Sequence, residues 1–184
     1  FDAAACELLS TQKQLCRSYL DLMRGDGNPG DAQALRAQEV QQQTRFGQLL
    51  DSAETDTYEV REMRQQWRRY RSQTEELTET MERWHESFAE LKALDLSLLL
   101  PNLAPFGAEL DERLAQMGRM LANQAPERQP AVMDLTLNAA EIGALSHFHK
   151  AALAVTCSRL KHLELLTRAL FERLSGIKGF GQSI

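Results

Sequence analysis

The stretch that decides the fold is VREMRQQWRRYRSQTEELTETMERWHESFAEL, residues 60–91. Apolar side chains recur in it at alternating steps of three and four residues, which places them on one face of an α-helix. A single polar residue, Thr74, interrupts this face near its middle. The positions on the face are Val60, Met63, Trp67, Tyr70, Thr74, Leu77, Met81, Trp84, Phe88 and Leu91. The pattern predicts a long helix packed against others, with one core position that needs a polar partner.

Glycine and proline divide the rest of the chain into further helices. The segments GDGNPGD (residues 25–31), LLLPNLAPFG (98–107) and NQAPERQP (123–130) each break the helical pattern. The apolar spacing between them predicts helices at about 2–24, 32–53, 58–96, 103–122 and 131–177, with a flexible tail at 178–184. We therefore expect one domain over residues 1–184, an all-α antiparallel bundle of about five helices, two of them long.

Three acidic residues stand where helices are expected to begin. Asp2 follows Phe1, a pairing typical of an N-cap with an apolar staple, and Asp31 precedes the second helix. Asp56 stands three residues before Glu59, which is the spacing of a capping box. The polar segment at 54–57 therefore predicts a break between the second and third helices.

Composition narrows the classes of partner. The 184 residues carry a net charge of −5 and are 43% hydrophobic, as in an ordinary soluble globular protein. This acidic balance argues against nucleic acid or an anionic membrane surface as the main partner, because phosphate binding needs an excess of Lys and Arg. The three cysteines, Cys6, Cys16 and Cys157, have no recognisable spacing, and we expect buried thiols and no disulfides.

A second polar interruption is expected in the last helix. Its stripe at steps of seven reads Leu135, Ile142, His149, Thr156, Leu163, Leu170 and Ile177. If the two long helices are antiparallel neighbours, Thr74 faces His149 and Thr156 near mid-rod, with Arg159 one turn away. Two interpretations remain open: the polar groups bond within the protein, or they hold a small polar ligand between the helices.

Arginine residues form another candidate site on the third helix. Arg61, Arg64, Arg68 and Arg71 share one face, beside Trp67. Guanidinium groups bind carboxylates and phosphates in a bidentate manner, so the face suits a small organic anion. The alternative is a solvated face that pairs with acidic residues of a neighbouring helix. The candidate ligand-binding residues are thus Arg61, Arg64, Arg68, Thr74, His149, Thr156 and Arg159.

The chain offers little support for metal binding or catalysis. His147 and His149 are two residues apart and point to opposite sides of a helix, while His85 and His162 have no ligand-type residue three or four positions later. No Gly-rich phosphate loop precedes a helix, and no Ser or Cys lies in a recognisable nucleophile motif. We expect no metal, no cofactor and no enzymatic activity.

The order of these elements resembles a known class of domain. A first helix ending in YLDLMRGDGNPGD, a long helix with WRRY ahead of a glutamate-rich continuation, and one very long last helix resemble the extracytoplasmic helical-bundle sensor domains of bacterial chemoreceptors and histidine kinases. The resemblance implies a periplasmic ligand-binding domain between two membrane spans, acting as a homodimer that recognises a small organic anion or a partner protein. It implies ligand contacts at Arg61, Arg64, Arg68, Thr74 and His149.

Two other classes share the same architecture. A cytoplasmic helical adaptor, similar to the export chaperones of flagellar or type III secretion substrates, is also an antiparallel helical protein, and the tail LFERLSGIKGFGQSI suits a segment that folds on a protein client. A structural coiled-coil scaffold is the third possibility, in which every feature above is packing.

Overall fold

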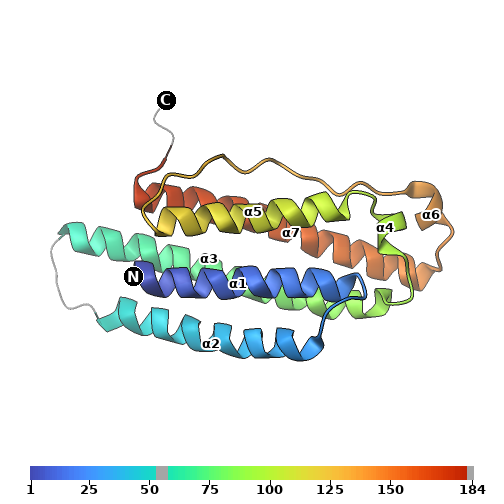
Figure 1. The fold of residues 1–184 in the computed structure, drawn as a ribbon, viewed down its shortest axis with the longest axis horizontal. Coiled ribbons are helices and arrows are strands. Elements are labelled where there is room, and N and C mark those ends of the chain that lie inside the picture. Colours follow the sequence, from blue (N-terminus) through green and yellow to red (C-terminus); the bar gives the residue numbers. More distant parts are fainter. Residues whose placement is uncertain (53–57, 182–184) are drawn as a thin grey trace.

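The chain is built of helices. The computed structural model describes residues 1–52 and 58–181, and in these residues it contains seven α-helices, one short 3-10 helix and no strand (Figure 1). Their bounds are α1 Asp2–Met23, α2 Pro29–Ser52, α3 Tyr58–Phe88, η1 Ala89–Leu91, α4 Leu96–Leu99, α5 Leu103–Leu121, α6 Ala139–Gly143 and α7 His147–Lys178. The prediction of an all-α chain is confirmed.

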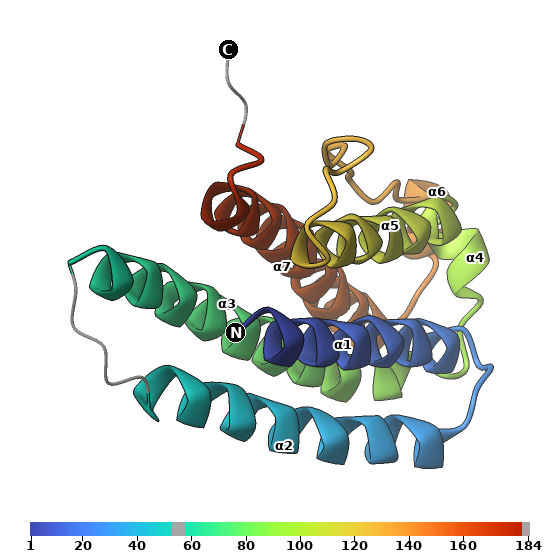
Figure 2. The ribbon, with the colours of Figure 1, turned by 60° about the vertical axis from the view of Figure 1, so that its left-hand side comes forward.

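The five longer helices surround one hydrophobic core. Helix α1 lies beside α2 and α5, helix α3 lies beside α2 and α7, and α5 and α7 are also neighbours (Figures 1 and 2). Each helix turns its apolar face inward, as the spacing of the sequence predicts. The largest fully buried apolar side chains are Trp84, Tyr19, Tyr70, Phe46, Phe106 and Phe171.

Most neighbouring helices run in opposite directions, but two contacting pairs do not. The side chains of Arg173 and Gln73 are hydrogen-bonded at 2.7 Å, and Thr156 meets Ser87 at 3.1 Å, so α3 and α7 are antiparallel. In contrast, α5 and α7 run in the same direction (Figure 1). So do α1 and α3, which are joined by hydrogen bonds from Gln12 to Thr74 and from Tyr19 to Glu82. The expected antiparallel arrangement therefore does not hold for these two pairs.

The parallel arrangement of α5 and α7 depends on a non-helical segment, residues 124–138, which we call the strap. The strap follows α5 and carries the chain back along the bundle before α7 begins (Figure 1). At about 3.3 Å per residue, its 15 residues reach farther than the helix of 19 residues that they retrace at about 1.5 Å per residue. An extended connection is thus long enough to return the chain.

The predicted last helix at 131–177 is wrong at its beginning. Residues 131–138 are extended, α6 is a short helix, and α7 begins only at His147. Asn138 and Ser146 each accept a hydrogen bond from a backbone amide three residues later and so cap α6 and α7. Leu135 in the strap and Ile142 in α6 are both partly buried against the core, so they continue the apolar period of seven without belonging to α7.

Other helix ends also differ from prediction. The expected helix at 58–96 ends at Phe88, and Asp95 then caps the separate helix α4 by accepting from the amide of Leu98 at 3.3 Å. Four leucines are buried by this change of direction, and that burial outweighs the local preference for helix. These buried leucines are Leu91, Leu96, Leu99 and Leu100.

The caps expected at Asp2 and Asp31 are wrong. Asp2 is already inside α1 and pairs with Lys178 at 2.7 Å. Helix α2 begins at Pro29, since proline fits the first helical position, and the side chain of Asn28 accepts from the amide of Gly30 at 2.8 Å. Asp56 and the break expected at 54–57 lie outside the described residues, so the capping box with Glu59 stays a prediction.

The C-terminal end of α7 is close to the predicted position. Helix α7 ends at Lys178, and Gly179 adopts the left-handed conformation (φ 75°) that commonly terminates a helix. Of the expected tail at 178–184, residues 182–184 lie outside the described part of the chain. Within the described part of the chain, no helix combines the length and the apolar character that crossing a membrane would require.

Candidate functional site

Thr74 lies where α1, α2 and α3 meet, and its side chain is buried. Its hydroxyl donates to the carbonyl of Arg71 at 2.7 Å and accepts from the side-chain amide of Gln43 at 3.0 Å. The carbonyl of Thr74 accepts from the side-chain amide of Gln12, also at 3.0 Å. The predicted interruption of the core is thus real, and its partners come from the first two helices.

The same hydrogen bonds continue one turn along α3. Gln12 also donates to the hydroxyl of Thr78 at 3.0 Å, and that hydroxyl donates to the carboxylate of Glu39 at 2.7 Å. All of these side chains are at most 8% exposed. We call the set Gln12, Glu39, Gln43, Thr74 and Thr78 the polar layer.

Charged residues close one end of the polar layer. The guanidinium of Arg36 bonds the carboxylates of Glu39 and Glu82, the latter at 3.1 Å, and the hydroxyl of Tyr19 donates to Glu82. Burial, and then the hydrogen bond and negative charge of Glu82, raise the pKa of Tyr19 well above its usual range. Tyr19 therefore stays a neutral donor at physiological pH.

A groove of about 370 Å³ opens onto the polar layer between α2 and α3. Four carboxylates line it against two guanidinium groups, and each Arg is already engaged by a Glu: Arg36 as described, and Arg71 by Glu75 at 2.9 Å. Arg83, outside the lining, pairs with Glu79 at 2.6 Å, so the groove with its paired residues has an excess of one negative charge. Its lining residues are Arg36, Glu39, Val40, Gln43, Thr44, Arg71, Glu75, Thr78, Glu79 and Glu82.

Two acceptors in the polar layer have no donor. Oε1 of Gln12 and Oε1 of Gln43 are buried, and no hydrogen bond reaches either atom from the described residues. An unsatisfied buried acceptor lowers the free energy of unfolding by about 1–3 kcal/mol. Natural proteins therefore rarely leave two such acceptors in one layer unless a ligand or water bonds them. The layer lacks donors, and Gln43 belongs to the lining of the groove.

The arginine face of α3 is divided by its surroundings. Arg71 turns to α2, where its Nε donates to the carbonyl of Gln43 at 3.3 Å, and Arg68 faces Asp51 at 3.5 Å on the surface. Arg61 is exposed near the beginning of α3. Arg64 differs, because its Nε and Nη2 atoms are buried and have no hydrogen-bond partner within residues 1–52 and 58–181.

The predicted residues of the last helix lie far from Thr74. The contact between Arg173 and Gln73 sets the register, and Thr156 is 17 positions before Arg173, or about 25 Å along the helix. The expectation that Thr74 faces His149 and Thr156 is therefore wrong. The reason is register: the two helices are antiparallel, but the predicted helix began 16 residues too early.

Each of these α7 residues has a local environment. The amide of His149 donates to Ser146 in the cap of the helix, and its half-buried ring lies beside Phe148. The buried hydroxyl of Thr156 is 2.9 Å from the carbonyl of Ala152 and 3.1 Å from the hydroxyl of Ser87. Arg159 is half-buried on α7. The structure brings together none of the three with Thr74.

The thiols are free and differ in burial. Cys6 is exposed, Cys16 is buried and Cys157 is half-buried. Burial is the main cause that raises the pKa of Cys16 to about 12 and that of Cys157 to about 11, so both stay protonated. Among the described side chains, no group of three His, Cys, Asp or Glu could hold a metal ion.

Sequence reasoning missed most of the polar layer, although a signal was present. Gln12 stands four residues after Leu8 and three before Leu15, at a core position of the first helix. Glu39 and Gln43 likewise continue a step of four along the buried face of α2. Polar residues at apolar positions of three helices therefore indicated one shared layer.

Comparison with protein-family models, with curated proteins and with solved structures finds no match.

Proposed function

We propose that the chain is a non-enzymatic recognition domain that binds a small polar ligand in the groove between α2 and α3. The observation that carries the proposal is Oε1 of Gln43, a buried acceptor that lacks a donor and belongs to a residue lining a groove of about 370 Å³. Oε1 of Gln12 in the same polar layer also lacks a donor. In this proposal the scaffold is a bundle of five helices, two of them long, with one parallel crossover.

The charges of the groove favour a ligand that donates hydrogen bonds. Four glutamates line the groove against two arginines that pair with three of them, and the fourth, Glu79, pairs with Arg83 outside the lining at 2.6 Å. The groove keeps an excess of one negative charge after these pairs are counted. A small organic cation, such as an alkyl amine or diamine, supplies the donor that Gln43 lacks and complements the net negative charge. This chemistry keeps the polar ligand expected from the sequence but reverses its charge at this position.

The proposed site also suits a sensor. A ligand in the groove bridges α2 and α3, and α3 packs along α7. Binding shifts the relative position of these helices only if the ligand binds one arrangement more tightly than another. A signal therefore depends on the polar layer, because its hydrogen bonds set the spacing of α1, α2 and α3.

The test is calorimetric titration with propane-1,3-diamine. Glu79→Gln removes one charge from the lining of the groove, and we expect about a 2- to 5-fold weaker affinity, as for one exposed ion pair. Glu76→Gln is the matched control, because Glu76 faces His162 of α7 at 3.4 Å and does not line the groove. Absence of diamine binding to the unmodified chain contradicts the proposal.

A second candidate is supported by Arg64. Its buried and unpartnered Nε and Nη2 atoms, together with Arg61 and Arg68 on the same helix, suit a small organic anion. Titration with citrate tests this site, and Arg64→Gln is expected to abolish an effect that Arg69→Gln, an exposed change one turn farther on, leaves intact. Citrate binding that survives Arg64→Gln rejects the candidate.

The proposal also covers the oligomeric state, the partner and the cellular compartment. The resemblance to sensor domains favours a periplasmic homodimer, and an adaptor for a helical client is the alternative. Light scattering of the purified chain tests the dimer, and fractionation of cells that express the full reading frame tests membrane association. Binding of a protein client without any response to amines or anions favours the adaptor.

A further inference from the structure

A larger cavity than the groove between α2 and α3 lies elsewhere, between the strap, α5 and α7. Its volume is about 490 Å³, within the range of small-molecule sites. None of its lining residues belongs to the polar layer or to the groove between α2 and α3. Apolar side chains form most of it, namely Phe106, Met133, Leu135, Leu137, Ala154 and Cys157.

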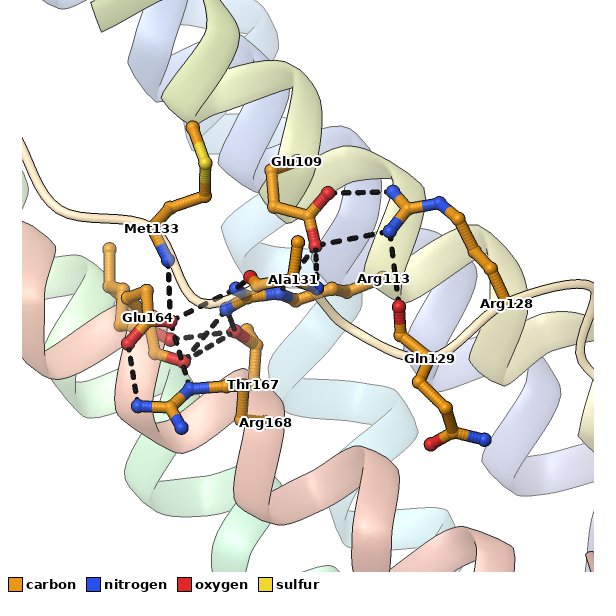
Figure 3. A network of polar contacts seen from close by, with 10 residues as sticks. Glu109, Arg113, Arg128, Gln129, Ala131, Met133, Glu164, Thr167 and Arg168 are labelled. Atoms are coloured by element: carbon orange, nitrogen blue, oxygen red, sulfur yellow. Dashed lines mark hydrogen bonds and ion pairs between the residues drawn. The ribbon is translucent and has the colours of Figure 1, made fainter.

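The strap is held on one side of this cavity by a buried ion network, which Figure 3 shows from close by. The side chain of Arg113 is 0% exposed, and it contacts the carboxylates of Glu109 and Glu164, each at 3.0 Å. Arg113 also donates to the carbonyl of Ala131, whose amide donates to Glu109 at 3.0 Å. The amide of Met133 donates to Glu164 at 3.3 Å.

Both carboxylates of this network are held in the ionised form. Burial opposes their ionisation, but hydrogen bonds from Arg128 and Arg113 outweigh it at Glu109, and bonds from Arg168 and Arg113 outweigh it at Glu164. The pKa of each carboxyl is therefore below its ordinary value. A fully paired charged network of this kind fixes the strap backbone firmly.

The strap is also held on the other side of the cavity. The side-chain amide of Asn102 donates to the carbonyl of Asp134 at 2.7 Å and accepts from the amide of Thr136 at 2.6 Å. The amide of Asn138 donates to the carbonyl of Leu99 at 3.0 Å. The strap is thus fixed at both ends of a preformed cavity, and Leu135 lies between the two anchors.

The lining of the cavity includes two residues of opposite charge, both exposed. Asp134 on the strap and Lys161 on α7 line it, together with the hydroxyl of Ser158. Neither Asp134 nor Lys161 forms an ion pair with another residue in the described part of the chain. Cys157, whose thiol stays protonated, adds to the apolar surface inside.

We infer that this cavity is a second binding site, for a small zwitterion with an apolar body such as a free apolar amino acid. The ammonium group faces Asp134, the carboxylate faces Lys161, and the side chain enters the pocket formed by Phe106, Met133 and Leu135. The inference is independent of the groove between α2 and α3, because the two sites share no residue.

Methyl NMR of methionine tests the position of the site directly. Titration of the whole chain with L-leucine is expected to shift the ε-methyl signal of Met133, which lines the cavity, and to leave the exposed Met63 on α3 unchanged. The Met133 signal is assigned with Met133→Leu. Absence of a saturable shift at Met133 up to millimolar leucine overturns the inference.

Two analogues separate the charges. Isoamylamine lacks the carboxylate of leucine, and 4-methylpentanoate lacks its ammonium group, and each loses one of the two charge contacts. We expect each to bind about 2- to 5-fold more weakly than leucine, the change that one exposed ion pair produces. Equal affinity for either analogue rejects the recognition of a zwitterion.

Two pairs of variants complete the test. Ala154→Trp fills the cavity from the surface of α7 and is expected to abolish the Met133 shift, whereas Ala151→Trp, equally exposed and outside the lining, leaves it. Lys161→Gln is expected to weaken leucine but not isoamylamine, and Lys150→Gln is its control on the same helix. A Met133 shift that survives Ala154→Trp contradicts the inference.

Discussion

The polar layer and the network around Arg113 are two buried polar regions with opposite designs. The polar layer joins three helices mainly through the amides and hydroxyls of glutamine and threonine, with one carboxylate, Glu39, and leaves two amide acceptors without donors. The Arg113 network joins two helices to the backbone of the strap through ionised groups, and Arg113, Glu109 and Glu164 are all paired. The polar layer therefore has acceptors free to bind a ligand, whereas the charged groups of the Arg113 network are already bonded within the protein.

This contrast has a physical basis. A buried charge that loses its partner is far more costly than a buried amide, so an ion network tolerates no missing contact. A neutral amide that lacks one donor costs only about 1–3 kcal/mol, which a ligand can recover. The Arg113 network is therefore a structural anchor, and the polar layer is the better candidate for reversible binding.

The largest expected effect is at Arg113. Arg113→Met leaves the carboxylates of Glu109 and Glu164 buried without their shared cation, and we expect the free energy of unfolding to fall by about 3–5 kcal/mol. Arg17→Met is the control, because Arg17 meets Asp111 at 3.0 Å on the surface and should cost at most about 1 kcal/mol. Urea unfolding measures both. Equal costs contradict the contrast between anchor and surface pair.

The same network predicts a dependence on acid. Because the folded protein holds the pKa of Glu109 and of Glu164 below the ordinary value, their contribution is fully present above the unfolded pKa of about 4.3. The contribution is lost as the pH falls through the lowered folded value. Thermal unfolding between pH 7 and the acid range is expected to show this loss, and Glu164→Gln should reduce its size. An unchanged acid profile in Glu164→Gln shows that the carboxylate is not ionised in the fold.

A smaller effect is expected in the polar layer. Thr74→Val removes the acceptor of the Gln43 amide at similar volume, so we expect a loss of about 1–3 kcal/mol. Thr44→Val, an exposed change whose hydroxyl bonds only its own helix at Val40, is the control and should change stability little. A stable Thr74→Val variant indicates that the layer rearranges freely.

Gln43→Met sharpens the contrast at the smallest scale. The substitution removes the unpartnered Oε1, which stabilises the fold, and it also removes the hydrogen bond to Thr74, which destabilises it. The two contributions to the free energy of unfolding offset each other. We expect a net change in unfolding free energy of about 1 kcal/mol or less, together with loss of diamine binding. Retained diamine affinity in Gln43→Met moves the ligand away from the polar layer.

Much of the helical content follows from sequence, and so does the buried position of Thr74. The spacing of residues 60–91 places Trp67, Leu77 and Trp84 in the core, and the glycine and proline turns separate α1, α2 and α5 where expected. These features depend on local pattern and on amphipathic burial, which a single sequence carries.

The strap and the partners of Thr74 did not follow from sequence. Leu135 and Ile142 continue the period of α7, yet residues 131–138 are extended because Glu109, Asn102 and Glu164 bond their backbone. Such bonds join residues far apart in the chain and leave no local pattern. The register between α3 and α7 depends on where α7 begins, and α7 begins only after the strap and α6. The residues that face Thr74 therefore could not be predicted without the strap.

The most direct test of the proposed function is a crystal structure of the chain grown with propane-1,3-diamine. The account predicts an ammonium group in the groove between α2 and α3, within hydrogen-bond distance of Oε1 of Gln43 and close to Glu79. An empty groove, with Oε1 of Gln43 bonded to a donor of the protein itself, would contradict it and return the polar layer to a purely structural role.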